Sequence, residues 1–180
     1  MASNVFQRIK ELAPDQQQAF QDFNEAVFQD GALSKKEKEI IAVAIAHVTQ
    51  CSHCMDTHTK KAKHEGASLK ELVEAGFVAA GIEAGGAVTH STHIPNAQDS
   101  EAQDALYVRS NLKKLNFVGK HAHTGFRGYS NFSAASTKEG ELSNKFKEII
   151  AVAVAHATQC PLCIERHTKN AVKAGASDQE

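Results

Sequence analysis

Two segments of the sequence repeat one another and decide the fold. The first is Lys38-Glu-Ile-Ile-Ala-Val-Ala-Ile-Ala-His-Val-Thr-Gln-Cys51-Ser-His-Cys54, and the second is Lys147-Glu-Ile-Ile-Ala-Val-Ala-Val-Ala-His-Ala-Thr-Gln-Cys160-Pro-Leu-Cys163. Residues 31–68 align with residues 140–177 without a gap, and nearly two-thirds of the aligned positions are identical. Self-similarity of this kind indicates a tandem duplication.

Each copy predicts helices joined by short turns. Ser34 and Glu37 have the spacing of a capping box, in which the two side chains satisfy free backbone N–H groups at a helix start. The apolar run behind them is rich in alanine and lacks Gly and Pro, so we expect a buried helix that ends near His47. Its content of Ile and Val leaves a buried strand as the alternative.

Three further helices are expected in the first copy. One should hold residues 54–65 and end at Gly66, which suits the left-handed position after a helix. A second capping box begins at Ser68 and opens a helix over residues 69–88. Upstream, residues 16–28 place four apolar side chains on one helical stripe: Phe20, Phe23, Val27 and Phe28.

The segment between the copies is assigned to loops and one connecting helix. Residues 91–99 are expected to form a loop, residues 101–115 a helix and residues 119–128 a loop. No segment alternates as a half-buried strand would, so the predicted class is all-α with two tandem repeats. The predicted divisions are a first repeat over residues 1–98, a connecting helix and loop over residues 99–127, and a second repeat over residues 128–180.

The second repeat appears in this sequence without the last helix of the first. Ser177-Asp-Gln-Glu180 again has capping-box spacing, and no helical body follows it. We therefore expect a truncated second repeat in a fragment of a longer protein. The alternative is that a partner chain supplies the helix.

Composition excludes several classes of function. Hydrophobic residues make up 42% and charged residues 23%, which is typical of a globular protein. The 20 basic and 21 acidic residues give a net charge of −1, so no basic field exists for nucleic acid. The first residues lack the features of a signal peptide, and the run Ile40–Ala46 is too short to span a bilayer. We expect a cytoplasmic protein without nucleic-acid or membrane partners.

The four cysteines form two Cys-x-x-Cys pairs, which indicate redox or metal chemistry in a reducing compartment. Cys51, Cys54 and His58 share one face of a helix. A helix N-terminus stabilises a thiolate, and a histidine one turn further on can move a proton near neutral pH. Glu39 lies on the preceding helix, which should pack against this one. The second repeat has the same spacing in Glu148, Cys160, Cys163 and His167.

These residues resemble the alkylhydroperoxidase D-like, carboxymuconolactone decarboxylase superfamily. The pattern Glu-x11-Cys-x-x-Cys-x3-His is complete in both repeats, and the first pair contains His53, as alkylhydroperoxidase D proteins do. The resemblance covers residues 20–93 and 128–180. It implies an all-helical fold that assembles into trimers or hexamers.

The resemblance also implies thiol-dependent reduction of hydroperoxides. Cys54 would attack the peroxide and Cys51 would resolve the product, with His53 as a possible auxiliary residue. The electron donor would be a dithiol, such as a lipoylated or thioredoxin-like protein, and neither a cofactor nor a metal is expected. Family members with decarboxylase activity generally lack the cysteine pair, so that reaction is disfavoured.

Two other functions stay open. One is a non-enzymatic zinc-binding or redox-sensing module, although the stripe supplies three ligands where structural zinc takes four. The other is a catalytically idle assembly subunit. His121 and His123 form a weak metal signal in the expected loop.

The remaining histidines and glycines are assigned structural roles. His47 and His156 are expected to be core or interface residues, and His90 and His93 loop residues. The glycines at positions 81, 85 and 86 follow no strand, so they should permit close helix packing rather than form a phosphate loop.

The two sites are expected to be unequal. Only the first repeat has His53 and a third helix, which should cover its own redox pair. Cys160 and Cys163 should therefore be more exposed and closer to ordinary thiols. Pro161 between them should stiffen the turn.

Overall fold

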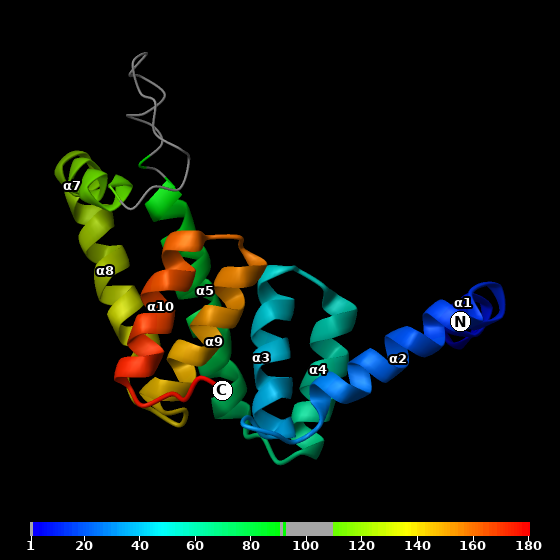
Figure 1. The fold of residues 1–180 in the computed structure, drawn as a ribbon. Helices are drawn as coiled ribbons and strands as arrows, with labels where there is room; N and C mark the ends of the chain where they lie inside the picture. The colour runs from blue at the N-terminus through cyan, green and yellow to red at the C-terminus, as the bar shows by residue number, and fades with distance from the viewer. Residues whose placement is uncertain (1, 91, 93–109) are drawn as a thin grey trace.

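The computed structural model of the chain describes residues 2–90, 92 and 110–180 (Figure 1). Within these ranges it contains nine α-helices and no strand, which confirms the predicted all-α class. The helices are α1 Ala2–Leu12, α2 Pro14–Phe28, α3 Lys35–Val48, α4 Ser52–His64, α5 Leu69–His90, α7 Asn111–His121, α8 His123–Thr137, α9 Asn144–Ala157 and α10 Pro161–Lys173. The expected loop at 93–99 and the start of the expected helix at 101–109 lie outside the described residues.

The duplication is more extensive in the structure than in the sequence. The helices α7, α8, α9 and α10 begin and end at the positions equivalent to those of α1, α2, α3 and α4. The pair α1 and α7 has no identical residue at equivalent positions, so sequence comparison alone did not detect it. Among the described residues only α5 has no counterpart.

The helix starts are stabilised by the predicted capping boxes. Glu37 N donates to Ser34 Oγ at 3.3 Å, and Ser34 N donates to the Glu37 carboxylate at 2.8 Å. These bonds fix α3 as a helix and exclude the strand alternative. Ser177 and Glu180 make the same reciprocal bonds, at 2.9 and 3.3 Å. Gly66 takes a left-handed φ of 86° after α4, as expected.

The prediction of a loop over residues 119–128 is wrong. All of these residues are described, and Ala122 alone interrupts the helices α7 and α8. Glycine disfavours a helix interior by about 1 kcal/mol relative to alanine, but it does not stop a helix as proline does. The packing of α8 against α5 outweighs that cost.

The core lies where α3, α5 and α9 meet. Ile40 and Val43 of α3 and Ile150 and Val154 of α9 are almost fully buried. α5 packs against both helices, so it belongs to the first repeat by sequence but covers both repeats in space (Figure 1).

Two glycines of α5 permit its close contact with α8. A Cβ at Gly81 would lie 2.9 Å from Ser136 Oγ, and one at Gly85 would lie 2.7 Å from Tyr129 Oη. The predicted close packing is confirmed at these two positions. At Gly86 no described atom lies within 4 Å of such a Cβ, so that glycine does not take part.

α1 and α2 extend away from the core as an arm (Figure 1). All of α2 is described, and none of its residues is buried. The predicted stripe is helical, but Phe20 is 62% and Phe23 65% exposed. Phe20, Phe23 and Val27 therefore face solvent in the single chain, whereas Phe28 is partly buried.

Among the described helices, α5 alone has the length and composition of a membrane span. Of its most apolar window, 44% is buried inside the protein. Nearly half of this window is thus used in packing, and α5 contacts α3, α8 and α9.

Candidate active sites

The turn that leads into each cysteine pair is built in the same way in both repeats. Gln50 and Gln159 both adopt a left-handed φ of 54°. Cys51 N donates to the carbonyl of Ala46 at 3.2 Å, and Gln50 N donates to that of His47 at 3.3 Å. This is the C-terminal cap usually made by glycine, which is why the sequence did not predict it here.

The turn places both cysteine pairs at helix N-termini. Cys51 is the N-cap of α4 and forms a disulfide with Cys54, with a Cα–Cα distance of 5.2 Å. Cys160 and Cys163 form the same disulfide at the start of α10. Cys54 N donates to Cys51 Sγ at 3.2 Å, so the sulfur of Cys51 receives one of the free N–H groups of the helix start.

Each histidine of the motif contacts the glutamate of the preceding helix. His58 Nδ1 lies 2.6 Å from Glu39 Oε2, and His167 Nδ1 lies 2.7 Å from Glu148 Oε2. The carboxylate holds the proton on Nδ1 and leaves Nε2 as the nitrogen that accepts a proton. Glu39 is only 1% exposed, so this bond also compensates for its burial. The structure thus brings together the glutamate and histidine that the sequence pattern singled out.

The surroundings of the two carboxylates differ. Lys61 Nζ lies 3.9 Å from Glu39 Oε1, whereas the equivalent Asn170 donates to Glu148 Oε1 at 3.3 Å. Phe28 stacks on His58 with ring centroids 5.5 Å apart, and the second repeat has Thr137 at that position. The first site is therefore more cationic and more aromatic than the second.

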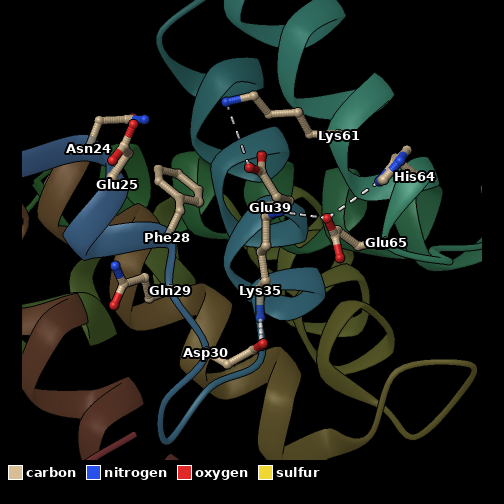
Figure 2. A pocket seen from close by; sticks show the side chains of 10 residues that line it. All are labelled: Asn24, Glu25, Phe28, Gln29, Asp30, Lys35, Glu39, Lys61, His64 and Glu65. Carbon is tan, nitrogen blue, oxygen red and sulfur yellow. Dashed lines mark hydrogen bonds and ion pairs between the residues drawn. The ribbon is translucent and has the colours of Figure 1, made fainter. Parts of the chain in front are cut away.

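A pocket of about 540 Å³ opens beside Glu39, between α2 and α4 (Figure 2). Its wall is charged, and an ion pair of 2.8 Å between Lys35 and Glu65 crosses it. The hydrogen bond from Lys35 lowers the pKa of the Glu65 carboxyl, so this pair stays charged at neutral pH. The lining residues are Asn24, Glu25, Phe28, Gln29, Asp30, Lys35, Glu39, Lys61, His64 and Glu65.

The prediction that the second pair is more exposed is wrong. Cys160 is 0% and Cys163 7% exposed, whereas Cys51 and Cys54 are both partly exposed. The reason is that α5 packs more closely against α10 than against α4. The third helix of the first repeat thus packs against the helix that bears the second pair and makes at most weak contact with the helix that bears the first pair.

The structure tests part of what was expected of the other histidines. His47 and His156 are exposed, and each bonds through Nδ1 to the carbonyl four residues earlier, at 2.8 Å. They are therefore not core residues of the single chain. His90 belongs to α5 rather than to a loop, and His93 lies outside the described residues.

The remaining metal and auxiliary candidates gain no ligand set. His53 is exposed on the first turn of α4, and His121 and His123 are exposed where α7 meets α8. In the part of the chain that the structure describes, no three His, Cys, Asp or Glu side chains are placed to hold a metal ion.

Comparison with known proteins places both repeats in one family. The model of the carboxymuconolactone decarboxylase family matches residues 14–97 and 125–180, which is most of the chain. Uncharacterized protein 4 in the cox locus of Paracoccus denitrificans is 49% identical over 73 residues, which are 41% of this chain and 66% of that protein. An uncharacterized protein of Cupriavidus necator is 37% identical over 81 residues, which are 45% of this chain and 70% of that protein. The chain thus spans about two-thirds of the length of each relative, and no solved structure matches it.

Proposed function

The chain belongs to the carboxymuconolactone decarboxylase family, and we propose that it is a thiol-dependent peroxidase that reduces hydroperoxides. The family includes alkylhydroperoxidase-like proteins. The observation that carries the proposal is the 2.6 Å contact of Glu39 with His58 on the helix that bears the Cys51–Cys54 pair. A glutamate-held imidazole one turn after a cysteine is suited to removing the thiol proton.

The reaction starts from the reduced pair. His58 Nε2 takes the proton of the Cys54 thiol, and Glu39 stabilises the imidazolium through Nδ1–H. The thiolate attacks the terminal oxygen of the hydroperoxide and breaks the O–O bond. Cys54 becomes a sulfenic acid, and the leaving alkoxide takes the proton from His58 to form an alcohol.

Cys51 then resolves the intermediate. Its sulfur attacks the Cys54 sulfenic acid, water leaves, and the disulfide seen in the structure forms. An external dithiol, such as a lipoylated or thioredoxin-like protein, reduces the disulfide and becomes oxidised in its place. The part exposure of Cys51 and Cys54 supports such an encounter.

The proposal assigns attack to Cys54 rather than Cys51. Cys54 and His58 are four residues apart on α4, so their side chains share one face. Cys51 sits at the N-cap, outside the regular helix, and its sulfur already accepts the N–H of Cys54. That position suits a resolving sulfur, which needs to reach Cys54 rather than a base.

The proposal also includes self-association, as a trimer or similar, of a cytoplasmic protein. A groove of about 420 Å³ beside α5 is lined mostly by apolar residues, and two of them, Leu69 and Phe77, are 71% and 58% exposed. Exposed apolar surface of this kind is typical of subunit interfaces. A light-scattering mass equal to one chain at micromolar concentration would contradict this part.

The test of the activity is thiol titration of the reduced chain before and after one equivalent of cumene hydroperoxide. Two thiols should be lost per reacted pair, and Glu39→Gln should slow the loss about 100-fold because it cannot stabilise the imidazolium. Asp56→Asn removes an exposed carboxylate from α4, the helix that begins at the cysteine pair, and serves as the control. If the reduced chain keeps all its thiols, the proposed activity is wrong.

Dimedone trapping tests the assignment of the two sulfurs. Cys51→Ser should accumulate a sulfenic acid on Cys54, because the resolving sulfur is missing. Labelling of Cys51 in Cys54→Ser, with none of Cys54 in Cys51→Ser, would reverse the two roles.

A further inference from the structure

The second repeat holds α5 in a binding surface that we call the cradle. Its polar part is the turn at residues 139–142 with Lys147, and its apolar part is the face of α8 formed by Tyr129, Phe132 and Ser136. Both parts contact one side of α5.

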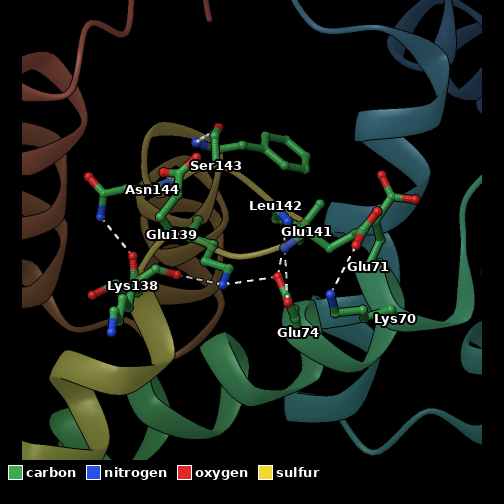
Figure 3. Close-up of polar contacts among 12 residues, drawn as sticks. Lys70, Glu71, Glu74, Lys138, Glu139, Glu141, Leu142, Ser143 and Asn144 are labelled. Carbon is green, nitrogen blue, oxygen red and sulfur yellow. Dashed lines mark hydrogen bonds and ion pairs between the residues drawn. The ribbon is translucent and has the colours of Figure 1, made fainter.

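Glu74 fills the polar part of the cradle (Figure 3). Its carboxylate accepts the N–H groups of Glu141 and Leu142, both at 3.0 Å, and pairs with Lys147 Nζ at 3.0 Å. Burial alone would raise the pKa of Glu74, but the two N–H groups and Lys147 lower it to about 2. The cradle therefore recognises an anionic side chain on the bound helix.

The apolar part recognises the turns of α5 that follow. Phe77 meets Phe132 edge to face with ring centroids 6.5 Å apart. One and two turns further on, Gly81 and Gly85 allow α8 to approach closely. The cradle thus recognises the pattern Glu-x2-Phe-x3-Gly-x3-Gly on one face of a helix.

The first repeat contains the same cradle. Gly31, Leu33 and Lys38 stand at the positions of Gly140, Leu142 and Lys147, and α2 has Phe20, Phe23 and Val27 at the positions of Tyr129, Phe132 and Ser136. The turns share one hydrogen bond, because Gly31 N donates to the Leu33 carbonyl and Gly140 N to the Leu142 carbonyl, both at 3.1 Å. Sequence and backbone geometry therefore agree that this surface is preserved.

The first cradle is not filled by the described part of this chain. Among the described residues, no carboxylate forms an ion pair with Lys38, and the backbone N–H groups of Ala32 and Leu33 donate to no acceptor. Phe23 is 65% exposed, whereas the equivalent Phe132 is half-buried. Because the two residues are identical, the difference comes from the helix that covers one of them.

We propose that the first cradle binds an α-helix of a partner chain that carries the pattern read by the second cradle. The anion requirement comes from Lys38 and the two N–H groups, and the aromatic and small residues match the stripe on α2. The α2 residues that line the pocket at Glu39 are Asn24, Glu25 and Phe28, which differ from the three residues of the first cradle. A second copy of this chain does not offer its α5, because its own α8 already covers that face.

The experiment uses a fluorescent peptide of residues 66–90, which carries the pattern, added to the full chain. We expect saturable binding by anisotropy, at least ten-fold weaker for Phe23→Asp and for Lys38→Met. Val172→Ala, at an exposed apolar residue of α10 outside the cradle, is the matched control and should bind as the parent does. Hydrogen exchange should show new protection of the N–H groups of Ala32 and Leu33.

Peptide variants keep the test independent of the folding of the chain. The peptide with Glu74→Gln should bind at least ten-fold more weakly, and the peptide with Gly81→Leu should do the same. The proposal is wrong if Phe23→Asp leaves the affinity for the peptide unchanged. It is also wrong if α5 of the chain loses its protection from hydrogen exchange, because the peptide would then have displaced α5 from the second cradle. Dimers of the chain that Phe23→Asp dissociates would overturn it too, since the occupant would then be a second copy. None of these outcomes depends on the peroxidase activity.

Discussion

The two redox sites have the same motif but different surroundings. Cys51 and Cys54 are partly exposed, whereas Cys160 and Cys163 are buried. The glutamate–histidine contact is nearly the same in both, at 2.6 and 2.7 Å. The comparison shows that a duplicated motif preserves the chemistry within a site, while access to it depends on helices that lie elsewhere in the sequence.

This difference assigns unequal tasks to the two pairs. A disulfide that an external dithiol can reach can be reduced in every cycle, whereas a buried one resists exchange. We therefore expect the first pair to turn over and the second to act mainly as a covalent link at the start of α10.

The largest expected effect is a difference in hydroperoxide consumption between variants of the two cysteine pairs. Cys54→Ser should lower hydroperoxide consumption about 100-fold or more, because it removes the attacking sulfur of the accessible site. Cys163→Ser, the matched change in the buried site, should lower it less than about two-fold. Steady-state rates with saturating dithiol measure both, and equal losses would show that the sites are equivalent.

Glu74→Gln tests whether α5 is the cover of the second site. Loss of a charged acceptor for two N–H groups and Lys147 should destabilise the protein by about 2 kcal/mol. Loosening of α5 should also speed reduction of Cys160–Cys163 and leave that of Cys51–Cys54 unchanged. Chemical denaturation and mass-spectrometric thiol labelling measure the two effects, and an unchanged second disulfide would assign its protection to another element.

The effect of Glu74→Gln on the free energy of unfolding should depend on pH. Because the pKa of Glu74 is about 2 in the folded chain and 4.5 ordinarily, its contribution to stability is complete above about pH 4.5. The contribution is lost as the pH falls through 2, because the carboxylate is protonated in both states only below that pH. The gap in unfolding free energy between the parent chain and Glu74→Gln should therefore narrow over this interval, and a constant gap would contradict the assigned contacts.

The two disulfides can also be compared in the parent chain by the rates at which they are reduced. A thioredoxin-like protein should reduce Cys51–Cys54 at least about ten-fold faster than Cys160–Cys163, because the second pair is buried. Alkylation at timed intervals followed by mass spectrometry distinguishes the pairs. In denaturant the two rates should converge, which serves as the control, and equal rates in the native chain would remove the distinction.

The smallest expected effect concerns the neighbour of each carboxylate. Lys61→Asn gives Glu39 the neutral partner that Glu148 has in Asn170. Since the Lys61 side chain is 45% exposed and its Nζ lies 3.9 Å from the carboxylate, we expect a change of about two- to five-fold in the rate of the first site. Lys60→Asn, on the same helix, is the matched control. A change of more than about 100-fold would mean that Lys61 takes part in the chemistry itself.

Local signals in the sequence predicted α3, α4 and α5 well. Capping boxes at Ser34 and Ser68 and the glycine at position 66 act on neighbouring backbone groups, so they need no knowledge of the rest of the chain. The contact of Glu39 with His58 was likewise predictable, because a buried carboxylate needs a polar partner and the following helix supplied one.

Two features of the structure were not predicted from the sequence, one because of non-local packing and one because its residue carries no local signal. Residues 119–128 are helical because α8 lies against α5, although their glycines suggested a loop. The left-handed turn at Gln50 was missed because glutamine carries no signal for that conformation.

The sequence by itself determined the class, the duplication and the chemistry of each site, because helix caps, apolar periodicity and motif spacing are properties of short segments. Only the tertiary structure decided which site is open. That outcome depends on where α5 goes after it leaves the first repeat, and it packs against α9 and α10. Burial is a sum over neighbours distant in the chain, so two nearly identical motifs have unequal exposure.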